Sequence, residues 1–242
     1  MAERDGDDIA ALFPANLPPL AVDIDGTLTD ERRAVDTRIF PILRRWPAPV
    51  VVATGKAMPY PVALCEFLRI DPVVIAENGG VVLLERQDFV QFLGDPEAAE
   101  AVAEAYREQG YSLGWGELDI VNRWRETELA VSTDSPREPL EEIAARHGQR
   151  VVDTGFAYHV VSPDVNKGIG LETVAERLEL DVTEFVAIGD SENDAPMLDI
   201  AGMGIAVAHA HETAIGSADR VTDAAYAEGF LEAVEWVIGE FE

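Results

Sequence analysis

The sequence predicts an α/β fold: a Rossmann-like core with a parallel sheet, interrupted by an inserted α+β cap domain. Three observations predict it. Short apolar runs alternate with segments of helical periodicity near both ends of the chain, as in βαβ units. Between them lies a stretch in which helices are grouped with strands of antiparallel type. Clusters of polar residues follow several of the apolar runs directly.

The composition limits the class of protein. The chain has 242 residues, 48% of them hydrophobic, which is long and apolar enough for a sizeable core. Its 46 acidic and 18 basic residues give a net charge of −28, spread along the chain. This charge argues against nucleic acid and an anionic membrane surface as partners. It favours adaptation to high intracellular salt, as in a halophilic archaeon; the alternative is an ordinary acidic cytosolic protein.

Cysteine usage and hydropathy favour a cytoplasmic protein. Cys65 is the single cysteine, so no intrachain disulfide can form, and its apolar helical surroundings predict a core residue. We find no signal peptide and no apolar run of about 18 residues, so we expect no membrane contact.

The first part of the chain predicts half of the core. We interpret residues 1–19, which are acidic and then rich in proline, as a loose lead-in. Residues 20–82 hold three apolar strands separated by two helices, which favours a parallel, doubly wound sheet. The predicted strands are 20–24, 50–53 and 73–76, and the predicted helices are 36–45 and 59–69.

The pattern changes in residues 83–160, which we expect to form the cap. Pro136 stands at the start of one predicted helix and Gly148 follows its end, which is the usual asymmetry of helix ends. The predicted cap elements are helices 97–109 and 136–147 and strands 127–133, 150–154 and 157–162.

The α/β alternation resumes in residues 161–242, which we assign to the core. The final helix carries its apolar residues on one face, which indicates packing against the sheet. The predicted elements are helices 167–180 and 227–239 and strands 185–189 and 204–208. The chain therefore returns after the insertion to complete the sheet.

Two carboxylates follow the first predicted strand, in the run Asp23-Ile24-Asp25-Gly26-Thr27. Residues two apart in an extended chain point to the same side, so Asp23 and Asp25 converge. They lie at the carboxyl end of the strand, where open α/β sheets bind their ligands. Like charges this close need a cation, a shared proton or strong hydrogen bonds. An Asx-rich turn is the alternative interpretation of this run alone.

Further polar residues follow the other strands and should meet at the same edge. Asp190 and Asp194 add carboxylates, and hard oxygen ligands of this kind suit Mg²⁺. Helix capping is the alternative for this pair. Lys167 opens a predicted helix in a chain with few lysines, and with the hydroxyl of Thr54 it predicts a phosphate-binding site. A solvated lysine side chain is the alternative.

Four motifs in this order carry a resemblance. The runs D-x-D-G-T-L-T, T-G, K-G and G-D-S-E-N-D resemble the haloacid dehalogenase superfamily of phosphatases over nearly the whole chain beyond residue 19. The stretch between Asp23 and Thr54 is too short for a cap, so the insertion lies between the second and third motifs. This arrangement resembles the Cof-like branch with a type II cap.

Longer segments resemble the archaeal-type phosphoglycolate phosphatases within that branch. They are 76–80 (AENGG), 125–130 (RETELA), 154–159 (TGFAYH) and 189–194 (GDSEND). Two positions depart from the pattern. Lys56 stands where relatives often have Asn or Arg, and His209 stands where relatives usually have Asn. Both departures bear on the rim of the site and so on fine substrate preference.

The resemblance implies a role for each residue of the phosphate site. Asp23 is expected to be the nucleophile that forms an aspartyl-phosphate. Asp25 is expected to protonate the leaving alkoxide and then to activate the hydrolytic water. Thr54, Gly55 and Lys167 are expected to bind the phosphoryl group.

The resemblance also implies Mg²⁺ as the cofactor. Its expected ligands are Asp23, the main-chain carbonyl of Asp25, and Asp190. Asp194 is expected to bind it directly or through water. Asn193 is expected to orient the neighbouring ligands.

The substrate is expected to be a small phosphorylated metabolite, with 2-phosphoglycolate first. Arg123 or Arg125 is a candidate for binding its carboxylate, although surface pairing with acidic residues is the simpler interpretation for each. We interpret His159 as structural. A sugar-phosphate phosphatase or phosphomutase of the same fold, and a non-enzymatic regulatory module, remain alternatives. The sequence leaves open whether the protein is a monomer or a homodimer.

Overall fold

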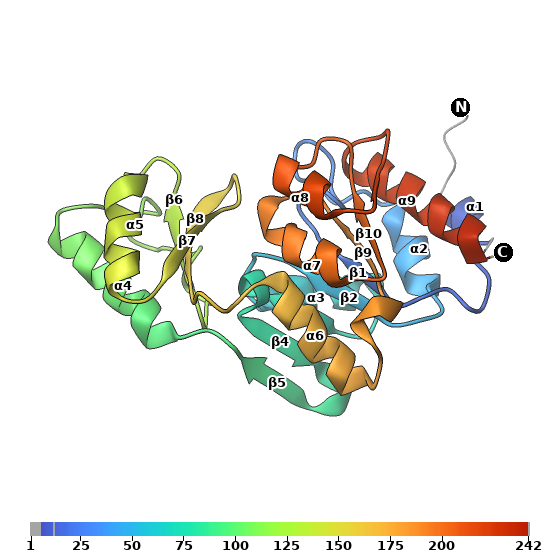
Figure 1. The fold of residues 1–242 in the computed structure, drawn as a ribbon, viewed down its shortest axis with the longest axis horizontal. Helices are drawn as coiled ribbons and strands as arrows, with labels where there is room; N and C mark the ends of the chain where they lie inside the picture. The colour runs from blue at the N-terminus through green and yellow to red at the C-terminus, as the bar shows by residue number, and fades with distance from the viewer. Residues whose placement is uncertain (1–5, 12, 242) are drawn as a thin grey trace.

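A computed structural model describes residues 6–11 and 13–241 and contains two sheets, each covered by its own helices (Figure 1). The larger sheet has eight strands in the order β11-β10-β9-β1-β2-β3-β4-β5. The pairs from β11 to β3 are parallel, and β4 and β5 are antiparallel. These strands are β1 (Leu20–Val22), β2 (Val50–Ala53), β3 (Val73–Ala76), β4 (Val81–Leu84), β5 (Phe89–Phe92), β9 (Val186–Gly189), β10 (Met203–Ala206) and β11 (Arg220–Val221).

Strand β1 lies near the middle of this sheet, between β2 and β9. Its three residues are buried because both faces of the sheet are covered by helices, and side chains alternate between the two faces. Leu20 and Val22 pack into one hydrophobic cluster, while Ala21 packs into the other. Asp23, the residue after β1, therefore lies at the carboxyl end of a strand that is paired on both sides.

The helices form a layer on each face of the larger sheet. The cluster on one face includes residues of α1, α2 and α9, and the cluster on the other face includes residues of α6, α7 and α8. The core helices are α1 (Gly6–Ala10), α2 (Ile39–Arg45), α3 (Pro59–Leu68), α6 (Lys167–Leu178), α7 (Ala195–Ile200), α8 (Glu212–Ser217) and α9 (Tyr226–Phe241). Short 3₁₀ turns are η1 (Glu77–Gly79), η2 (Glu85–Gln87), η3 (Val182–Glu184) and η4 (Glu192–Asp194). Cys65 in α3 is fully buried, as predicted, and burial raises the pKa of its thiol to about 12.

The smaller sheet is antiparallel and has its own hydrophobic cluster, as predicted for the cap (Figure 1). Its strand order is β6-β8-β7, and residues of α4 and α5 pack into its cluster. Helix α4 begins with Asp95, whose side chain accepts a hydrogen bond from the N–H of Ala98. The cap elements are α4 (Pro96–Glu108), β6 (Leu129–Ser132), α5 (Arg137–Arg146), β7 (Arg150–Asp153) and β8 (Ala157–Val161).

The structure differs from the expected boundaries at two places. We expected the cap to begin at residue 83, but β4 and β5 belong to the core sheet, because β4 pairs antiparallel with β3. We expected a loose lead-in over residues 1–19, but Gly6–Ala10 is helical, and Ile9 and Leu17 are buried in the core. Residues 1–5 lie outside the described part of the chain. The division into domains itself stays a prediction.

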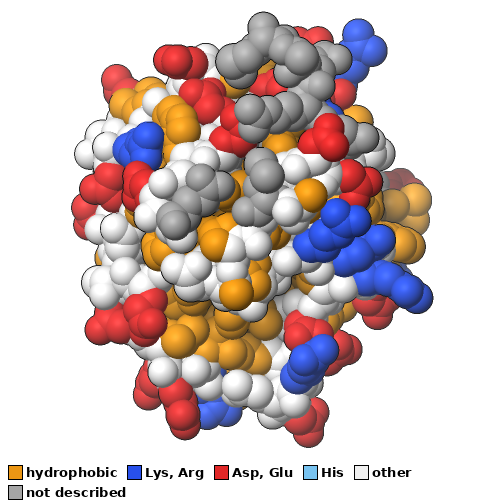
Figure 2. Space-filling view, turned by 90° about the vertical axis from the view of Figure 1, so that its right-hand side faces the viewer, with side chains coloured by type: hydrophobic (Ala, Val, Ile, Leu, Met, Phe, Trp, Pro, Cys, Tyr) orange, Lys and Arg blue, Asp and Glu red, His pale blue; other side chains and the backbone are white. Residues whose placement is uncertain are grey.

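Acidic side chains are distributed over the face of the molecule that Figure 2 shows, with basic side chains at fewer places. This distribution agrees with a charge that is spread along the chain. Within residues 6–11 and 13–241, no helix combines the length and apolar character needed to cross a membrane.

Candidate active site

Four buried or half-buried charged residues meet at the carboxyl ends of β1 and β9. Asp23 follows β1, Asp190 follows β9, and Asp194 closes η4. The Nζ atom of Lys167, at the start of α6, donates to Oδ1 of Asp23 at 2.6 Å and to Oδ1 of Asp194 at 2.5 Å. Lys167 is 0% exposed, so its ammonium group has lost its hydration water and is bound by two carboxylates in its place.

The charges at this point do not balance. Carboxylate oxygens of Asp23, Asp190 and Asp194 lie within 4.8 Å of one another, and Lys167 is the cation that bonds to two of them. Burial, with Asp194 and Asp190 adding to it, raises the pKa of Asp23 well above its ordinary value. Burial and Asp194 raise the pKa of Asp190 to about 7. A cluster of hard oxygen donors with surplus negative charge suits a divalent cation such as Mg²⁺.

Asp194 shapes the loop that follows β9. Its Oδ2 accepts hydrogen bonds from the N–H groups of Asp190, at 3.0 Å, and Ser191, at 2.9 Å. The backbone passes close to these carboxylates. A Cβ on Gly26, whose φ is +85°, would lie 2.2 Å from Oδ2 of Asp190, and a Cβ on Gly189 would lie 2.6 Å from Cγ of Asp194. Glycine is therefore required at both positions.

Asp25 belongs to a different part of the site. Its side chain is 33% exposed and forms an ion pair with Lys56, with 2.8 Å between Oδ2 and Nζ. It is not one of the three clustered carboxylates. The expected metal contact of Asp25 runs through its main-chain carbonyl and stays a prediction. The carboxyl group of Asp25 thus lies outside the cluster that Lys167 holds. A residue that transfers protons to and from substrate and water needs such a separate position.

Thr54 and Gly55 follow β2 and support the same edge of the sheet. Thr54 is buried, and its Oγ1 accepts a hydrogen bond from the N–H of Lys56 at 3.1 Å. Gly55 lies against Asn78, whose Oδ1 would be 2.8 Å from a Cβ at that position. The carbonyl of Gly55 accepts a hydrogen bond from the cap, from Nη1 of Arg125 at 3.0 Å.

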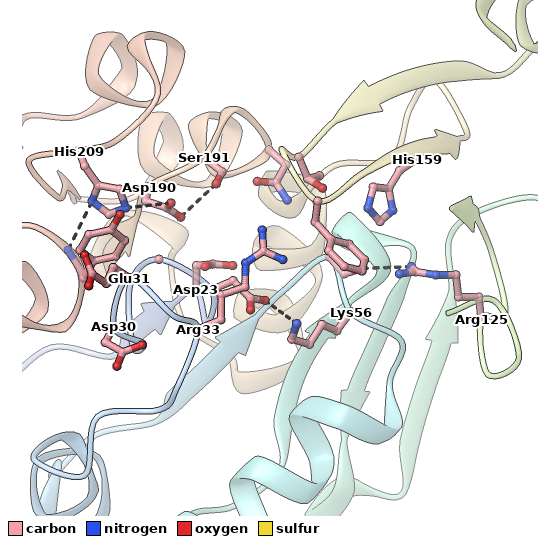
Figure 3. Close-up of a pocket in the computed structure, with 17 residues that line it drawn as sticks. Asp23, Asp30, Glu31, Arg33, Lys56, Arg125, His159, Asp190, Ser191 and His209 are labelled. Carbon is pink, nitrogen blue, oxygen red and sulfur yellow. Dashed lines mark hydrogen bonds and ion pairs between the residues drawn. The ribbon is translucent and has the colours of Figure 1, made fainter. Parts of the chain in front are cut away.

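A cavity of about 270 Å³ lies between the core and the cap (Figure 3). The predicted residues Asp23, Asp25, Gly55, Asp190 and Asn193 line it, whereas Thr54, Lys167 and Asp194 are buried and do not. The other residues lining it are Gly26, Asp30, Glu31, Arg33, Lys56, Arg125, Thr154, Phe156, His159, Ser191, His209 and Tyr226.

A buried carboxylate, Glu128, organises the cap side of the cavity. Its Oε1 accepts from Nη1 of Arg125 and lies 2.8 Å from Nδ1 of His159, and its Oε2 accepts from Nδ2 of Asn78 at 2.7 Å. We call these four residues the Glu128 cluster. Burial acts to raise the pKa of Glu128, but His159 and Arg125 hold that pKa below its ordinary value.

The Glu128 cluster is connected to the loop after β9, which carries Asp190 and Asn193. Oδ1 of Asn78 accepts a hydrogen bond from Nδ2 of Asn193 at 2.7 Å. Beside it, the carboxylate of Glu77 accepts from the N–H groups of Glu126 and Thr127 and from Oγ1 of Thr127, at 2.8–3.1 Å. Core residues of η1 therefore hold the cap segment before β6 at several points.

Sequence reasoning missed part of this site. The segments 76–80 and 125–130 were singled out, but nothing indicated that Asn78 and Glu128 pair with each other. Phe156, in the turn between β7 and β8, lies in the segment 154–159, but no role was assigned to it; its ring lies 5.5 Å from that of Trp115 and 5.3 Å from the guanidinium of Arg33. An aromatic residue directly after Gly155, between two predicted strands, was the available signal.

The two departures from the family pattern both line the cavity. Lys56 pairs with Asp25. Nε2 of His209 lies 3.6 Å from Oδ2 of Asp190, and its ring packs on Tyr226 with 3.8 Å between centroids. Of the two candidate arginines, Arg125 lines the cavity and Arg123 does not.

Residues 20–123 and 127–234 match the haloacid dehalogenase-like hydrolase family. The chain belongs to this family. The predicted resemblance to the superfamily is therefore confirmed, and so is the predicted fold class.

Proteins similar to this haloacid dehalogenase-like hydrolase include two named phosphoglycolate phosphatase. The one from Haloarcula marismortui is 63% identical over 91% of this chain and 97% of its own length. The one from Natronomonas pharaonis is 59% identical over 90% of this chain and 96% of its own length. Halophilic archaea are thus a source of close relatives, as the acidic composition led us to expect.

Solved structures share the fold of this haloacid dehalogenase-like hydrolase. Protein 0175 of Thermoplasma acidophilum superposes with a TM-score of 0.80 at 24% identity, over 91% of this chain and 98% of that one. The subclass IIB sugar phosphatase BT4131 gives a TM-score of 0.71 at 17% identity, over 90% and 98% of the two chains.

Proposed function

We propose that this protein is a cytoplasmic, Mg²⁺-dependent phosphomonoester hydrolase that converts 2-phosphoglycolate to glycolate and phosphate. The observation that carries the proposal is the arrangement of Asp23 and Asp25. One carboxylate is held by Lys167 within an acidic cluster, and the other faces the same cavity outside that cluster. Relatives about 60% identical to this chain bear the name phosphoglycolate phosphatase. We expect the active protein to be either a monomer or a homodimer.

Asp23 acts as the nucleophile in this proposal. Lys167 holds Oδ1 of Asp23, so the other oxygen is the one available to attack the phosphorus. A bond forms between that oxygen and phosphorus as the bond from phosphorus to the ester oxygen breaks. Asp25 gives its proton to the departing alkoxide, which leaves as the alcohol.

The second half of the reaction uses Asp25 in the opposite sense. The Asp25 carboxylate takes a proton from a water molecule, whose oxygen attacks the phosphorus of the aspartyl-phosphate. The bond between phosphorus and Asp23 breaks, which releases phosphate and restores the carboxylate. Thr54, Gly55 and Lys167 bind and orient the phosphoryl group through both halves.

The acidic cluster fits Mg²⁺ by the chemistry of its donors. Asp23, Asp190 and the main-chain carbonyl of Asp25 would hold the ion, and Asp194 would do so directly or through water. Asn193 would orient these ligands. When bound, Mg²⁺ supplies positive charge that offsets the charge of the phosphoryl oxygens.

The test is phosphate release at high KCl with Mg²⁺, from a panel of 2-phosphoglycolate, sugar phosphates and p-nitrophenyl phosphate. We expect the highest kcat/KM with 2-phosphoglycolate and a loss of at least ~10⁴-fold in Asp23→Asn, since the nucleophile is removed. A preference for sugar phosphates would overturn the proposed substrate. Full turnover by Asp25→Asn would overturn the proposed acid and base.

A further inference from the structure

The geometry points to a carboxylate-binding subsite at the cap end of the cavity, formed by Arg125 and positioned by Glu128. This inference rests on the proposed function, since it assigns the part of the site that recognises the acid group of the substrate. The phosphate end of the cavity is the same for every phosphomonoester. The subsite would therefore set which ester is hydrolysed.

The guanidinium of Arg125 is fixed in position, with one edge free. Nε donates to the carbonyl of Val121 at 3.1 Å, and Nη1 donates to the carbonyl of Gly55 and to Glu128. Nη2 has no hydrogen-bond partner in residues 6–11 and 13–241. The side chain is 4% exposed yet lines the cavity, so its free edge is offered there. A planar group held this way suits a carboxylate, which it binds through two oxygens.

His159 lies beside Arg125 on the same buried carboxylate. Its Nδ1 contacts Oε1 of Glu128, and its Nε2 has no partner in the described chain. His159 is almost fully buried and lines the cavity, as Figure 3 shows for both side chains. Glu128 thus fixes the side chains of Arg125 and His159 at the wall of the cavity, which makes it a positioning residue for Arg125.

The other cations that line the cavity are less suited to this task. Lys56 is paired with Asp25, and Arg33 is exposed and lies over the ring of Phe156. The opposite rim carries Asp30 and Glu31, which repel an anionic group. A second negative charge on the substrate therefore meets its favourable partner at Arg125.

The subsite is connected through hydrogen bonds to the loop after β9. Asn193 donates to Asn78, and Asn78 donates to Glu128, each at 2.7 Å. This buried chain of amides links the loop that carries Asp190 to the group that positions Arg125.

The experiment compares 2-phosphoglycolate with ethyl phosphate, which has a methyl group in place of the carboxylate. In Arg125→Gln we expect kcat/KM for 2-phosphoglycolate to fall about 100-fold, while kcat/KM for ethyl phosphate changes less than about threefold. Arg123→Gln is the matched control, because it removes a nearby arginine that does not line the cavity. It should change neither value.

Two further variants protect the test against misfolding and identify the role of Glu128. Arg125→Lys keeps a cation beside Glu128 but loses the planar fork, and its kcat/KM for 2-phosphoglycolate should still fall about tenfold.

Glu128→Gln should raise KM for 2-phosphoglycolate about tenfold and leave kcat for ethyl phosphate unchanged. A purely structural role would lower kcat for both esters.

The outcomes separate failure of the subsite from failure of the proposed function. If the unmodified protein prefers 2-phosphoglycolate and both Arg125 variants keep that preference, the subsite is wrong and the function stands. Equal losses with both esters would also overturn the subsite. If the unmodified protein prefers a sugar phosphate, the proposed function is wrong, and the subsite fails with it.

Discussion

The two halves of the cavity are built in different ways. On the core side, Asp23 and Asp190 come directly after neighbouring strands of one parallel sheet, so the sheet itself brings them together. On the cap side, Arg125 and His159 are held by a carboxylate, Glu128, which bonds in turn to Asn78 of the core. In the proposed mechanism, phosphate chemistry thus depends on strand register, and substrate selection depends on hydrogen bonds between the core and the cap.

The two halves of the cavity also differ in the sign of the charge that they leave unpaired. The core half has three clustered carboxylates that share Lys167, and it keeps surplus negative charge for a cation. The cap half has one buried carboxylate for Arg125 and His159, and the guanidinium of Arg125 keeps a free edge for an anion. Substitutions in the core half should therefore change stability and turnover together, and those in the cap half should change selection.

Lys167→Met gives the largest expected effect. It leaves Asp23 and Asp194 facing each other in a buried site without a cation. We expect the free energy of unfolding to fall by about 3 kcal/mol or more, and turnover to fall at least ~10³-fold. Urea unfolding and phosphate release measure the two effects.

Lys56→Met is the matched control for stability. Lys56 is 37% exposed and pairs with a single carboxylate, so its loss should change the free energy of unfolding by less than about 1 kcal/mol. Equal destabilisation by the two variants would contradict the distinction between a buried and an exposed cation.

The metal-free protein should become less stable as pH rises from about 4 to 7. Asp190 has a folded-state pKa of about 7, above the ordinary value near 4, so the folded state binds its proton more tightly than the unfolded state does. The pKa of Asp23 is raised in the same direction. Deprotonation of Asp190 then costs the folded state about 4 kcal/mol.

Mg²⁺ should offset that cost, because its positive charge would neutralise the deprotonated carboxylates of the cluster. We expect the rise in Tm on adding Mg²⁺ to a chelator-treated sample to be several degrees larger at pH 8 than at pH 5. Asp190→Asn should reduce this difference. An equal rise at both pH values would mean that the cluster does not bind the ion.

Phe156→Ala gives the smallest expected effect and probes the cap side. The side chain is 41% exposed and packs on Trp115, with Arg33 over its ring. We expect KM to rise about threefold and the free energy of unfolding to change by less than about 1 kcal/mol. A fall in kcat with unchanged KM would place Phe156 with the chemistry of the core half.

Most of the core half could be predicted from the sequence. Asp23, Asp25 and Asp190 stand at the ends of apolar runs, and strand ends in a parallel sheet meet at one edge. Lys167 was predicted near them, although its simultaneous bonds to Asp23 and Asp194 were not. Local pattern was sufficient because the geometry is set by short segments of chain.

The cap half could not be predicted in the same way. Asn78 and Glu128 are 50 positions apart, and no periodicity links them. Residues 83–92, which complete β4 and form β5, were assigned to the cap because the alternation of strands and helices changes there, and only the pairing of β4 with β3 decides the matter. Long-range pairing, rather than local propensity, determines these parts.

The contacts of Glu77 and Asn78 also constrain how a reaction product can leave. A cap that moved away as one body would have to break the bonds from Glu126 and Thr127 to Glu77, together with the bond from Asn78 to Glu128. Each contributes about 1 kcal/mol. The turn that carries Phe156 meets the core through ring and cation contacts. These ring and cation contacts are weaker than the hydrogen bonds of Glu77 and Asn78, so we expect the cap to part from the core first at that turn.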